Sequence, residues 1–225
     1  MINIIVPSYN QAGYLREALD SCLNQTEHCF ITIVDDGSTD NSLEIAREYA
    51  KEGNVQVISQ TNKGLASARN TGIMNTRNDD DYLLFLDADD VLLPDAIEKI
   101  EKVIEETNAD IIAPSFKCFG KGDDTIILML NPTIEDFKTG NRVGYCQAIK
   151  REVLLEVGGY NPKMVWGAED YDLTFDLLKR GKKLVTIPDI LWLYRTKENS
   201  MWTETAKHQE EFMNQIKINH PTIFQ

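Results

Sequence analysis

The chain has few of the cysteine, histidine and basic residues that are typical of disulfide-rich secreted, zinc-finger or nucleic-acid-binding proteins. Its 225 residues include 4 cysteines, without a Cys-x-x-Cys pair, and 3 histidines whose spacing suggests no metal site. We expect free thiols in a reducing compartment and place His28, His208 and His220 at the surface. Basic residues number 23 against 36 acidic ones, and a formal net charge of −13 repels phosphate backbones. Nucleic acid is therefore not an expected partner.

Long apolar runs and common phosphate-binding loops are also absent from the sequence. No run reaches the length of a membrane-spanning helix, and the apolar start at 1–7 is too short for the core of a signal peptide. These features predict a cytoplasmic location, and peripheral membrane contact stays open although no basic amphipathic helix supports it. Neither Gly-x-Gly-x-x-Gly nor Gly-x4-Gly-Lys-Ser/Thr occurs, which argues against dinucleotide cofactors and P-loop phosphate transfer.

The composition, 42% hydrophobic and 26% charged, is that of a folded chain. Apolar β-branched runs alternate with segments of helical period through the first half, which is typical of βαβ units and a parallel sheet buried on both faces. The expected strands are 2–6, 31–34, 55–59, 82–86 and 110–113, with helices between them. The sequence therefore predicts an α/β fold whose first lobe covers residues 1–113.

The pattern changes beyond Pro114 and predicts a second lobe, 114–225. Apolar runs at 116–119 and 125–130 flank a glycine-rich stretch, which indicates a hairpin. The other expected elements are a strand within 144–150, a helix at 169–180, strands at 184–187 and 190–194, and a polar C-terminal helix. We expect a small mixed sheet here, packed with the first lobe as one compact unit.

Three polar clusters follow expected strands. They are Asp35-Asp36-Gly37-Ser38, Asn62-Lys63-Gly64 leading to Arg69-Asn70, and Asp87-Ala88-Asp89-Asp90. The ends of parallel strands meet at one edge of a sheet, where ligands bind in open α/β folds. Two carboxylates one residue apart, such as Asp87 and Asp89, can share a hard divalent cation with substrate phosphates. A solvated acidic loop is the alternative, and the buried strand before Asp87 favours function.

These motifs resemble those of the GT-A-fold inverting glycosyltransferases of family 2. They stand in this chain, in the order of that family, as Val6-Pro7-Ser8-Tyr9-Asn10, Val34-Asp35-Asp36-Gly37-Ser38, Gly64-Leu65-Ala66-Ser67-Ala68-Arg69-Asn70, Asp87-Ala88-Asp89 and Glu169-Asp170. Each motif alone is weak, but five in order form a specific match, which thins after Tyr194. The resemblance implies a GT-A-like, Rossmann-type nucleotide lobe with a smaller acceptor lobe. It also implies transfer of a sugar from a nucleotide donor to a glycan or glycolipid hydroxyl, as in polysaccharide biosynthesis.

The resemblance implies how the nucleotide is held. Pro7 and Tyr9 border the base, and Asp36 accepts a hydrogen bond from an imide N–H. A carboxylate facing an imide favours uracil over cytosine, so a UDP-sugar is the expected donor. Arg69 lies near the base or the diphosphate, with a helix-surface charge as the alternative. For Asp35, turn formation before a helix stays an alternative to a binding role.

The diphosphate is expected at the third cluster. By the resemblance, Asp87 lies by the ribose and diphosphate, and Asp89 is the direct ligand of Mn²⁺ or Mg²⁺, which prefer oxygen ligands. The family often carries Arg-x-His in its second lobe, whereas this chain has Arg195-Thr196-Lys197. A protonated lysine cannot coordinate a cation. Lys197 either contacts the diphosphate as a point charge or is solvated, which puts metal dependence in doubt.

The Glu169-Asp170 pair opens an expected helix, where acids also have a structural reason to occur. The resemblance makes Asp170 the base that takes the proton of the acceptor hydroxyl, and Glu169 binds the acceptor or braces the helix. Asp172, two residues on, is expected at the surface because helix neighbours at that spacing face apart. Trp166 is a candidate platform for a sugar ring, Trp192 is expected in the core, and Trp202 is undecided.

Two hypotheses from other classes compete with this interpretation. A phosphohydrolase of the haloacid dehalogenase type would use Asp87 as nucleophile and Asp89 as acid and base, although that pattern normally follows the first strand of its fold. A non-catalytic module that binds a sugar nucleotide would keep Asp36 and Asp89 and dispense with Asp170. The transferred sugar and the acceptor cannot be inferred, because the residues that would select them lie in the poorly patterned stretch 114–168.

Overall fold

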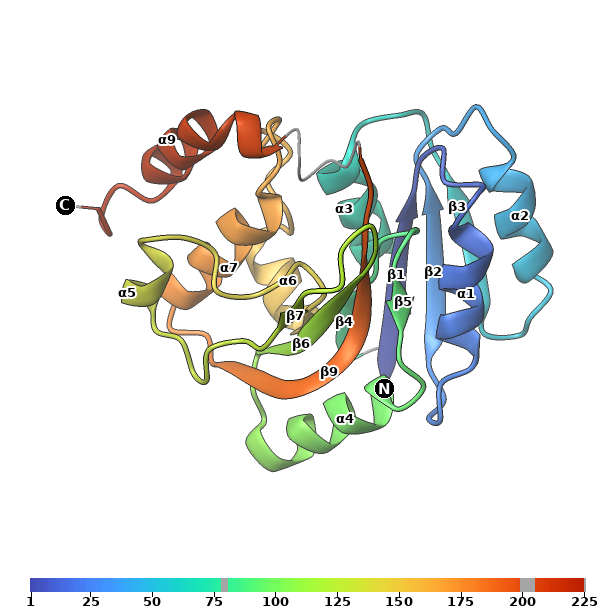
Figure 1. Ribbon diagram of the computed structural model, residues 1–225, viewed down its shortest axis with the longest axis horizontal. Helices are drawn as coiled ribbons and strands as arrows, with labels where there is room; N and C mark the ends of the chain where they lie inside the picture. The colour runs from blue at the N-terminus through green and yellow to red at the C-terminus, as the bar shows by residue number, and fades with distance from the viewer. Residues whose placement is uncertain (78–80, 199–204, 225) are drawn as a thin grey trace.

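The computed structural model of the chain describes residues 1–77, 81–198 and 205–224, which form the layered α/β arrangement of Figure 1. In chain order its elements are β1 (Ile2–Ser8), α1 (Leu15–Leu23), β2 (Phe30–Asp35), α2 (Ser42–Tyr49), β3 (Val55–Ser59), α3 (Leu65–Asn75), β4 (Tyr82–Phe85), β5 (Val91–Leu92), α4 (Ala96–Thr107), β6 (Ile111–Gly120), β7 (Thr125–Ile126), α5 (Ile134–Phe137), β8 (Ala148–Lys150), α6 (Arg151–Val157), α7 (Glu169–Lys179), β9 (Leu184–Thr196) and α9 (Gln209–Asn219). The expected fold class is confirmed. Among the described helices, none combines the length and apolar character needed to cross a bilayer.

One sheet runs through both halves of the chain, in the order β3-β2-β1-β4-β8-β6-β9-β5, with β7 paired to β6 outside this path. The first four strands are parallel, and their register places Ser8 beside Asp35 and Asp35 beside Ser59. The second half joins through antiparallel pairs of β8 with β4 and β6. The loops after β1, β2, β3 and β4 therefore leave the sheet at one edge, where the acidic clusters were expected to meet.

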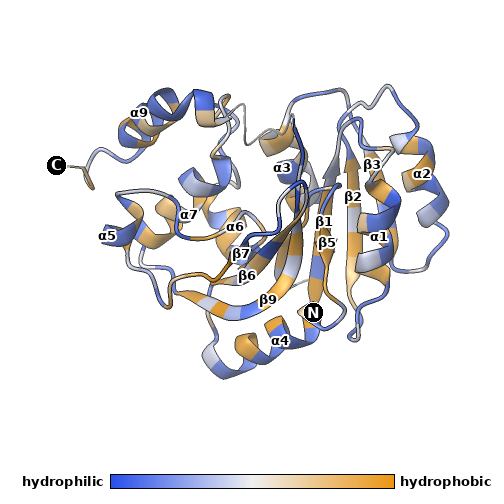
Figure 2. Ribbon diagram, viewed as in Figure 1, coloured by the Kyte–Doolittle hydropathy of each residue, from blue (hydrophilic) through white to orange (hydrophobic). Residues whose placement is uncertain are grey.

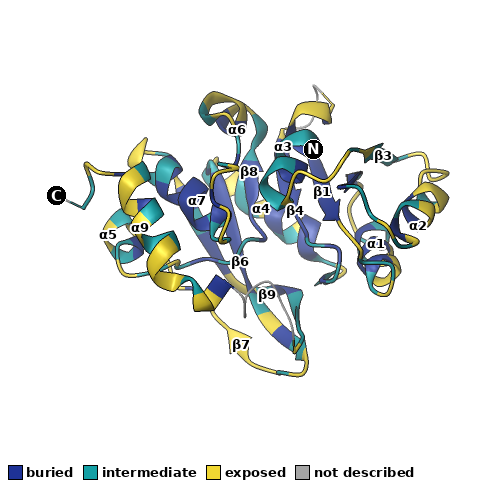
Figure 3. Ribbon diagram, turned by 90° about the horizontal axis from the view of Figure 1, so that it is seen from above, coloured by how far each residue is buried: buried dark blue, intermediate teal, exposed yellow. Residues whose placement is uncertain are grey.

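The sheet separates two hydrophobic cores. Alternate residues of β1 enter different cores, because side chains of a strand point to opposite faces. Ile4 and Val6 pack with apolar residues of α1, α2 and α4, whereas Ile5 packs with those of α3, α6 and α7. Figure 2 shows the hydrophobic strands between these helices, and Figure 3 shows exposed residues concentrated on the outer helices and the β7 hairpin.

Helix α3 lies close against β1. A Cβ added to Gly72 would stand 2.6 Å from Cγ2 of Ile5, so any larger residue at this position would force the buried Ile5 side chain to move. This close approach places the polar face of α3, which carries Arg69, near the carboxyl ends of β1 and β4.

The second half of the chain departs from the sequence prediction in detail. The two strands expected at 184–187 and 190–194 form one strand, β9, because its parallel ladder with β6 continues through register shifts near Ser115. The hairpin is confirmed, although its second strand is only β7. The short elements α5, α6 and β5 were not predicted. Strand β6 runs through residue 113, and the division into lobes at that residue stays a prediction.

Asp172 and His220, both predicted at the surface, are buried, with 5% and 3% of their area exposed. Nε2 of His220 lies 2.9 Å from Oδ1 of Asp172, which also accepts a hydrogen bond of 2.8 Å from Nδ2 of Asn219. The helical spacing correctly turned Asp172 away from Asp170, but it gave no sign that the C-terminal helix α9 would cover that face. Both surface predictions were therefore wrong.

The buried Asp172 network predicts a pH-dependent contribution to stability. Burial alone would raise the pKa of Asp172, but hydrogen bonds from His220, Asn219 and Asn161 outweigh it and lower that pKa. The contribution is therefore full above the unfolded-state pKa of about 3.9 and is lost as pH falls through the lower folded-state value. We expect Asp172→Asn to reduce the free energy of unfolding by about 1–3 kcal/mol at neutral pH.

Urea unfolding at neutral pH and at about pH 3 would check this expectation. The matched control is Asp176→Asn on the same helix, where the partly exposed carboxylate pairs with Arg180 at 2.8 Å. That control should change the free energy of unfolding by less than about 0.5 kcal/mol. An equal loss for Asp172→Asn at both pH values would show that the buried carboxylate charge contributes nothing.

Candidate active site

The first part of the site is the edge where β1 and β2 end. Pro7 is buried within β1, and Tyr9, just beyond it, has 46% of its area exposed. Asn10 adopts a positive φ of 54°, and its Oδ1 accepts hydrogen bonds from the backbone N–H groups of Thr39 (2.8 Å) and Asp40 (3.3 Å). The loops after the two strands are thereby fixed to each other.

The carboxylate of Asp36 closes the neighbouring loop onto this edge. Its Oδ1 accepts hydrogen bonds from Nε2 of Gln60 (2.7 Å) and the N–H of Lys63 (2.9 Å), and its Oδ2 accepts one from the N–H of Gly64 (2.8 Å). A carboxylate has about four acceptor positions, so these three bonds leave capacity for one more donor. The predicted bond to a base imide stays a prediction. Asp35 is buried as the last residue of β2.

Arg69 links its own motif, Gly64 to Asn70, to the Asp87-Ala88-Asp89 and Glu169-Asp170 motifs. Its side chain is 1% exposed; Nη2 lies 2.8 Å from Oδ1 of Asp87, and Nη1 lies 2.6 Å from Oε1 of Glu169. The guanidinium carbon lies 5.2 Å from the ring centres of both Tyr145 and Tyr160, within range of a cation–π contact. The alternative of a helix-surface charge is therefore wrong, and a single buried cation joins carboxylates that are far apart in sequence.

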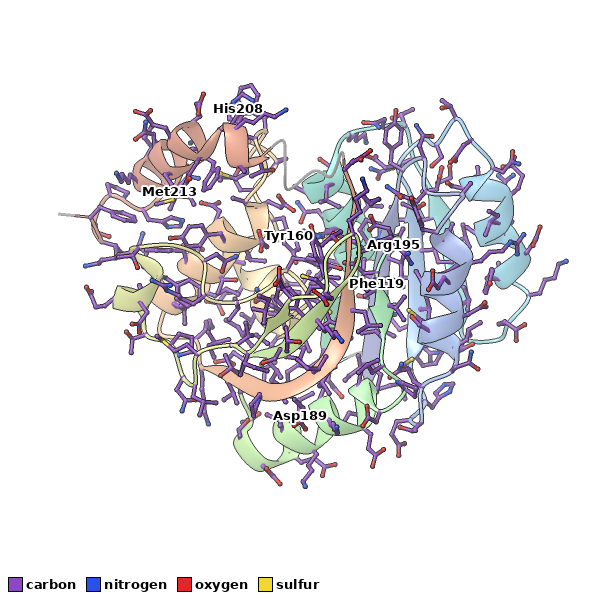
Figure 4. The ribbon with its side chains drawn as sticks, viewed as in Figure 1. Phe119, Tyr160, Asp189, Arg195, His208 and Met213 are labelled. Carbon is purple, nitrogen blue, oxygen red and sulfur yellow. The ribbon has the colours of Figure 1, made fainter. Side chains whose placement is uncertain are left out.

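Asn70, beside Arg69, holds a turn of the second half. Its Nδ2 donates to the carbonyl of Tyr160 and its Oδ1 accepts from the N–H of Tyr160, both at 2.7 Å. Gly159 in this turn has a φ of 77°, and a Cβ there would stand 2.3 Å from Oδ1 of Asn70. The turn places the Tyr160 ring against Arg69, and Figure 4 shows Tyr160 near the middle of the molecule.

The loop after β4 is held by Tyr145, Asp90 and Arg195, none of which was a predicted site residue. The hydroxyl of Tyr145 donates a short hydrogen bond to Oδ2 of Asp90 and accepts one of 3.1 Å from the N–H of Asp87. The N–H of Arg195 donates to Oδ1 of Asp90 at 2.6 Å, and Nε of Arg195 donates to the carbonyl of Asp89 at 2.7 Å. In the sequence, only the position of Asp90 next to the Asp-x-Asp pair indicated a role in the site. Tyr145 lies in the poorly patterned stretch 114–168, which gave no indication.

Burial raises the pKa values of two carboxyl groups in this loop. It raises the pKa of Asp87 to about 6, although Arg69 acts in the opposite direction and Asp89 adds to the rise. Burial, followed by repulsion from Asp89 and Asp87, raises the pKa of Asp90 well above its usual range. Asp90 is thereby favoured as a structural group, while Asp87 keeps 26% of its side chain exposed and can meet a ligand.

The predicted catalytic pair stands at the start of α7. Gly167 and Ala168 both have positive φ, 88° and 61°, and this sharp turn leads directly into Glu169 and Asp170. Asp170 is partly exposed, and its Oδ2 accepts a hydrogen bond of 3.0 Å from Nδ2 of Asn141. Burial, and then repulsion from Glu169, raises the pKa of Asp170 to about 6. The group can therefore accept a proton near neutral pH.

The structure describes two of the three tryptophans, Trp166 and Trp192. Trp166 is 46% exposed, and its ring stacks on His208 with centroids 3.9 Å apart, so one ring face is already covered. Its role as a sugar platform stays a prediction. Trp192 is 1% exposed and lies in the core, as predicted. Trp202 lies outside the described residues.

The residues present do not fit a tightly held divalent cation. Oδ1 of Asp87 is engaged by Arg69, and Oδ2 of Asp89 forms an ion pair with Nζ of Lys197. Over residues 1–77, 81–198 and 205–224, no group of three or more His, Cys, Asp or Glu side chains is placed to hold a metal ion. The alternative in which Lys197 is merely solvated is wrong, because its ammonium pairs with Asp89.

Two surface cavities, of about 720 and 750 Å³, lie elsewhere. One is lined by Tyr82 at the start of β4 and the other by Phe30 at the start of β2, so both lie at the opposite edge of the parallel strands. Neither contains a residue of the five motifs. The convergence of these motifs, rather than cavity size, therefore identifies the site.

Comparison with known proteins decides the family. The family model described as glycosyl transferase family 2 matches residues 3–158. The chain belongs to glycosyl transferase family 2. The resemblance inferred from the motifs is thus confirmed, and the match covers every motif except Glu169-Asp170. Glycosyltransferase GlyA of Streptococcus pneumoniae serotype 4 is 30% identical over 231 residues, covering 92% of this chain and 32% of GlyA. The chain therefore spans about a third of the length of GlyA.

Solved structures of glycosyltransferases share the fold. Residues 1–349 of Staphylococcus aureus TarS, in complex with UDP-GlcNAc, match with a TM-score of 0.80 at 20% identity, covering 97% of this chain and 66% of that chain. The mannosyltransferase PcManGT of Pyrobaculum calidifontis, in complex with GDP-Man and Mn²⁺, matches with a TM-score of 0.72 at 20% identity, covering 95% and 63%. The GT-A-like fold predicted from the sequence is thereby confirmed.

Proposed function

We propose that this family 2 domain transfers a sugar from a nucleotide-sugar donor to a hydroxyl of a glycan or glycolipid acceptor. One observation carries the proposal: Arg69 joins Asp87, at the end of a strand of the parallel sheet, to Glu169 of the Glu169-Asp170 pair. A group for the donor diphosphate and a group for proton removal thus belong to one rigid cluster. The solved relative TarS with UDP-GlcNAc supports the choice of a UDP-linked donor.

Each predicted residue has a task in this proposal. Pro7 and Tyr9 border the base, and the remaining acceptor position of Asp36 takes the imide N–H, which selects uracil. The ribose and diphosphate lie beside Asp87, and Trp166 offers its open face to a sugar of the acceptor. Glu169 anchors Arg69 and fixes the start of α7 next to the base, Asp170.

The reaction is a direct displacement with inversion. As the acceptor oxygen forms a bond to the anomeric carbon, the bond from that carbon to the diphosphate oxygen breaks, and the nucleoside diphosphate leaves with the electron pair. Asp170 takes the hydroxyl proton, which contributes about 10²–10⁴ in rate. Asn141 donates to the carboxylate of Asp170 and holds its lone pairs in a fixed direction. The phosphohydrolase hypothesis gains no support, since family membership and the pairing of Arg69 with Asp87 both argue against an aspartyl nucleophile.

Formation of UDP from a panel of UDP-hexoses and UDP-N-acetylhexosamines, with simple glycans as acceptors, tests the proposal. We expect UDP release that depends on an acceptor, and binding of UDP tighter than that of CDP by about tenfold or more, the cost of one mismatched hydrogen bond. Hydrolysis of p-nitrophenyl phosphate at a substantial rate, without UDP release from any donor, would favour the phosphohydrolase instead.

The raised pKa of Asp170 predicts the pH dependence of this reaction. The base is active when deprotonated, so kcat/KM should rise with pH, with a midpoint near the pKa of about 6, and then level off. Asn141→Ala removes a hydrogen bond that favours the charged carboxylate, so the midpoint should move to higher pH. Asp87 titrates in the same range, but it does not contact Asn141, so this shift separates the two groups.

Rates measured from about pH 5 to about pH 8 for the wild type and Asn141→Ala check this assignment. A profile without an acidic limb would remove Asp170 as the base that limits the reaction. An acidic limb whose midpoint is the same in the wild type and in Asn141→Ala would assign the titration to Asp87.

A further inference from the structure

The ammonium of Lys197 lies where a metal ion was expected. Nζ of Lys197 forms an ion pair with Oδ2 of Asp89, and both side chains are mostly buried, with 23% and 20% of their area exposed. The antiparallel pairing of β5 with β9, in which Val91 faces Leu193, aligns the loop before β5 with the end of β9. The contact is thus set by strand register, and Lys197 follows β9 directly.

A second contact fixes the ammonium from another side. Nζ of Lys197 lies 4.6 Å from the ring centre of Tyr14, and the guanidinium of Arg195 lies 4.8 Å from the same centre. Arg195 also stacks on Phe119 at 4.2 Å, and the two labelled side chains lie together near the end of β9 in Figure 4. The residue that caps α1, strand β6 and the loop after β4 therefore define the position of the β9 end that carries Lys197.

This arrangement disfavours a resident divalent cation. A cation at Asp89 would have to displace the ammonium and would then stand beside an unneutralised positive charge. Lysine offers no lone pair while protonated, so it cannot become a ligand in exchange. The other carboxylate of the pair, Asp87, is engaged by the buried Arg69.

We infer that Lys197 replaces the divalent cation of the donor site, so that nucleotide binding and sugar transfer proceed without a bound metal. This inference rests on the proposed function. Lys197 has three N–H donors on a flexible stem, so it keeps a hydrogen bond to Asp89 while it donates to the diphosphate. When the bond from the anomeric carbon to the diphosphate oxygen breaks, the electron pair stays on that oxygen and the ammonium neutralises the new charge. The acceptor proton goes to Asp170.

Calorimetric titration with UDP in EDTA, and again with Mn²⁺, tests the inference on three proteins: the wild type, Lys197→His and Lys182→His. Imidazole is a metal ligand and is mostly neutral at pH 7.5, so Lys197→His exchanges the ammonium for a coordinating nitrogen. Lys182 is the matched control, because it pairs with Glu156 at 2.6 Å and its side chain is 21% exposed, but it lies outside the motif cluster. Binding of Mn²⁺ alone, followed by electron paramagnetic resonance, gives a readout independent of UDP and of activity.

We expect the wild type and Lys182→His to bind UDP in EDTA, with a Kd that Mn²⁺ changes by less than about threefold. Lys197→His should lose about tenfold or more of its UDP affinity in EDTA, should regain it with Mn²⁺, and should bind Mn²⁺ more tightly than the wild type. Wild-type UDP binding that requires Mn²⁺ would overturn the inference and leave the proposed function intact. If none of the proteins bound UDP under any condition while the controls stayed folded, the proposed function itself would fail.

Discussion

Replacing Asp170 with asparagine is expected to lower turnover by about 10²–10⁴-fold while changing UDP affinity by less than about threefold. The amide keeps the shape of the side chain and can still meet Asn141, but it cannot accept the proton of the acceptor hydroxyl. The donor residues Asp36, Asp87 and Lys197 are unchanged. The expected effect therefore falls on kcat, and the position of the base at the start of α7 makes it separable from nucleotide binding.

Steady-state rates of UDP release, together with calorimetric UDP binding, measure the two effects separately. Asp176→Asn is the control on the same helix, since its partly exposed carboxylate pairs with Arg180 outside the motif cluster, and both quantities should match the wild type. Transfer that persists in Asp170→Asn at the wild-type rate would assign proton removal to another group. A protein that binds UDP but never transfers a sugar, before or after the substitution, would instead support a binding module.

Replacing Arg69 with methionine is expected to reduce the free energy of unfolding by about 3–5 kcal/mol, because it leaves the carboxylates of Asp87 and Glu169 without their buried partner. The side chains of Arg69 and Glu169 are 1% and 8% exposed, so water cannot readily replace the hydrogen bond that Glu169 loses. Arg69 lowers the pKa of Asp87, so its removal raises that pKa above the wild-type value of about 6. The loss should therefore be largest at high pH and should shrink as the pH falls toward about 6, where Asp87 of the variant becomes neutral. Arg69→Lys should restore little of the lost free energy of unfolding, because one ammonium lacks the fork that reaches both carboxylates.

Urea unfolding curves at about pH 5 and about pH 8 provide the measurement. Arg180→Met removes an exposed arginine whose Nε lies 2.8 Å from Asp176, and it should cost less than about 0.5 kcal/mol. A loss below about 1 kcal/mol for Arg69→Met would show that the buried bridge is not a principal support of the site. UDP affinity of the folded fraction should fall as well, since Asp87 would lose its fixed orientation.

The part of the site built on parallel strands could be predicted from the sequence. Short buried strands lead into the loops that carry Asp36 and Asp87, and the carboxyl ends of parallel strands share one edge of the sheet. The strand pattern therefore predicts that the polar residues of those loops belong to one site. The buried state of Arg69 was not decided in the same way, because a polar helix face looks identical whether solvent or a second layer covers it.

The contacts made by the second half could not be predicted, because they depend on long-range packing. The surface predictions for Asp172 and His220 failed once α9, about 40 residues further along the chain than α7, covered that helix. Tyr145 gave no pattern at all, since a single tyrosine in an irregular stretch fits a core as well as a site. For Lys197 the sequence offered two roles, and only the register between β5 and β9 placed its ammonium on Asp89.

A crystal structure of the chain with UDP bound tests the central claim most directly. The nucleotide site proposed here predicts uracil beside Tyr9 with its imide N–H on the carboxylate of Asp36, and the diphosphate within hydrogen-bond distance of Lys197. UDP bound at another surface, such as either cavity at the opposite edge of the sheet, would contradict the assignment of the five motifs to a donor site.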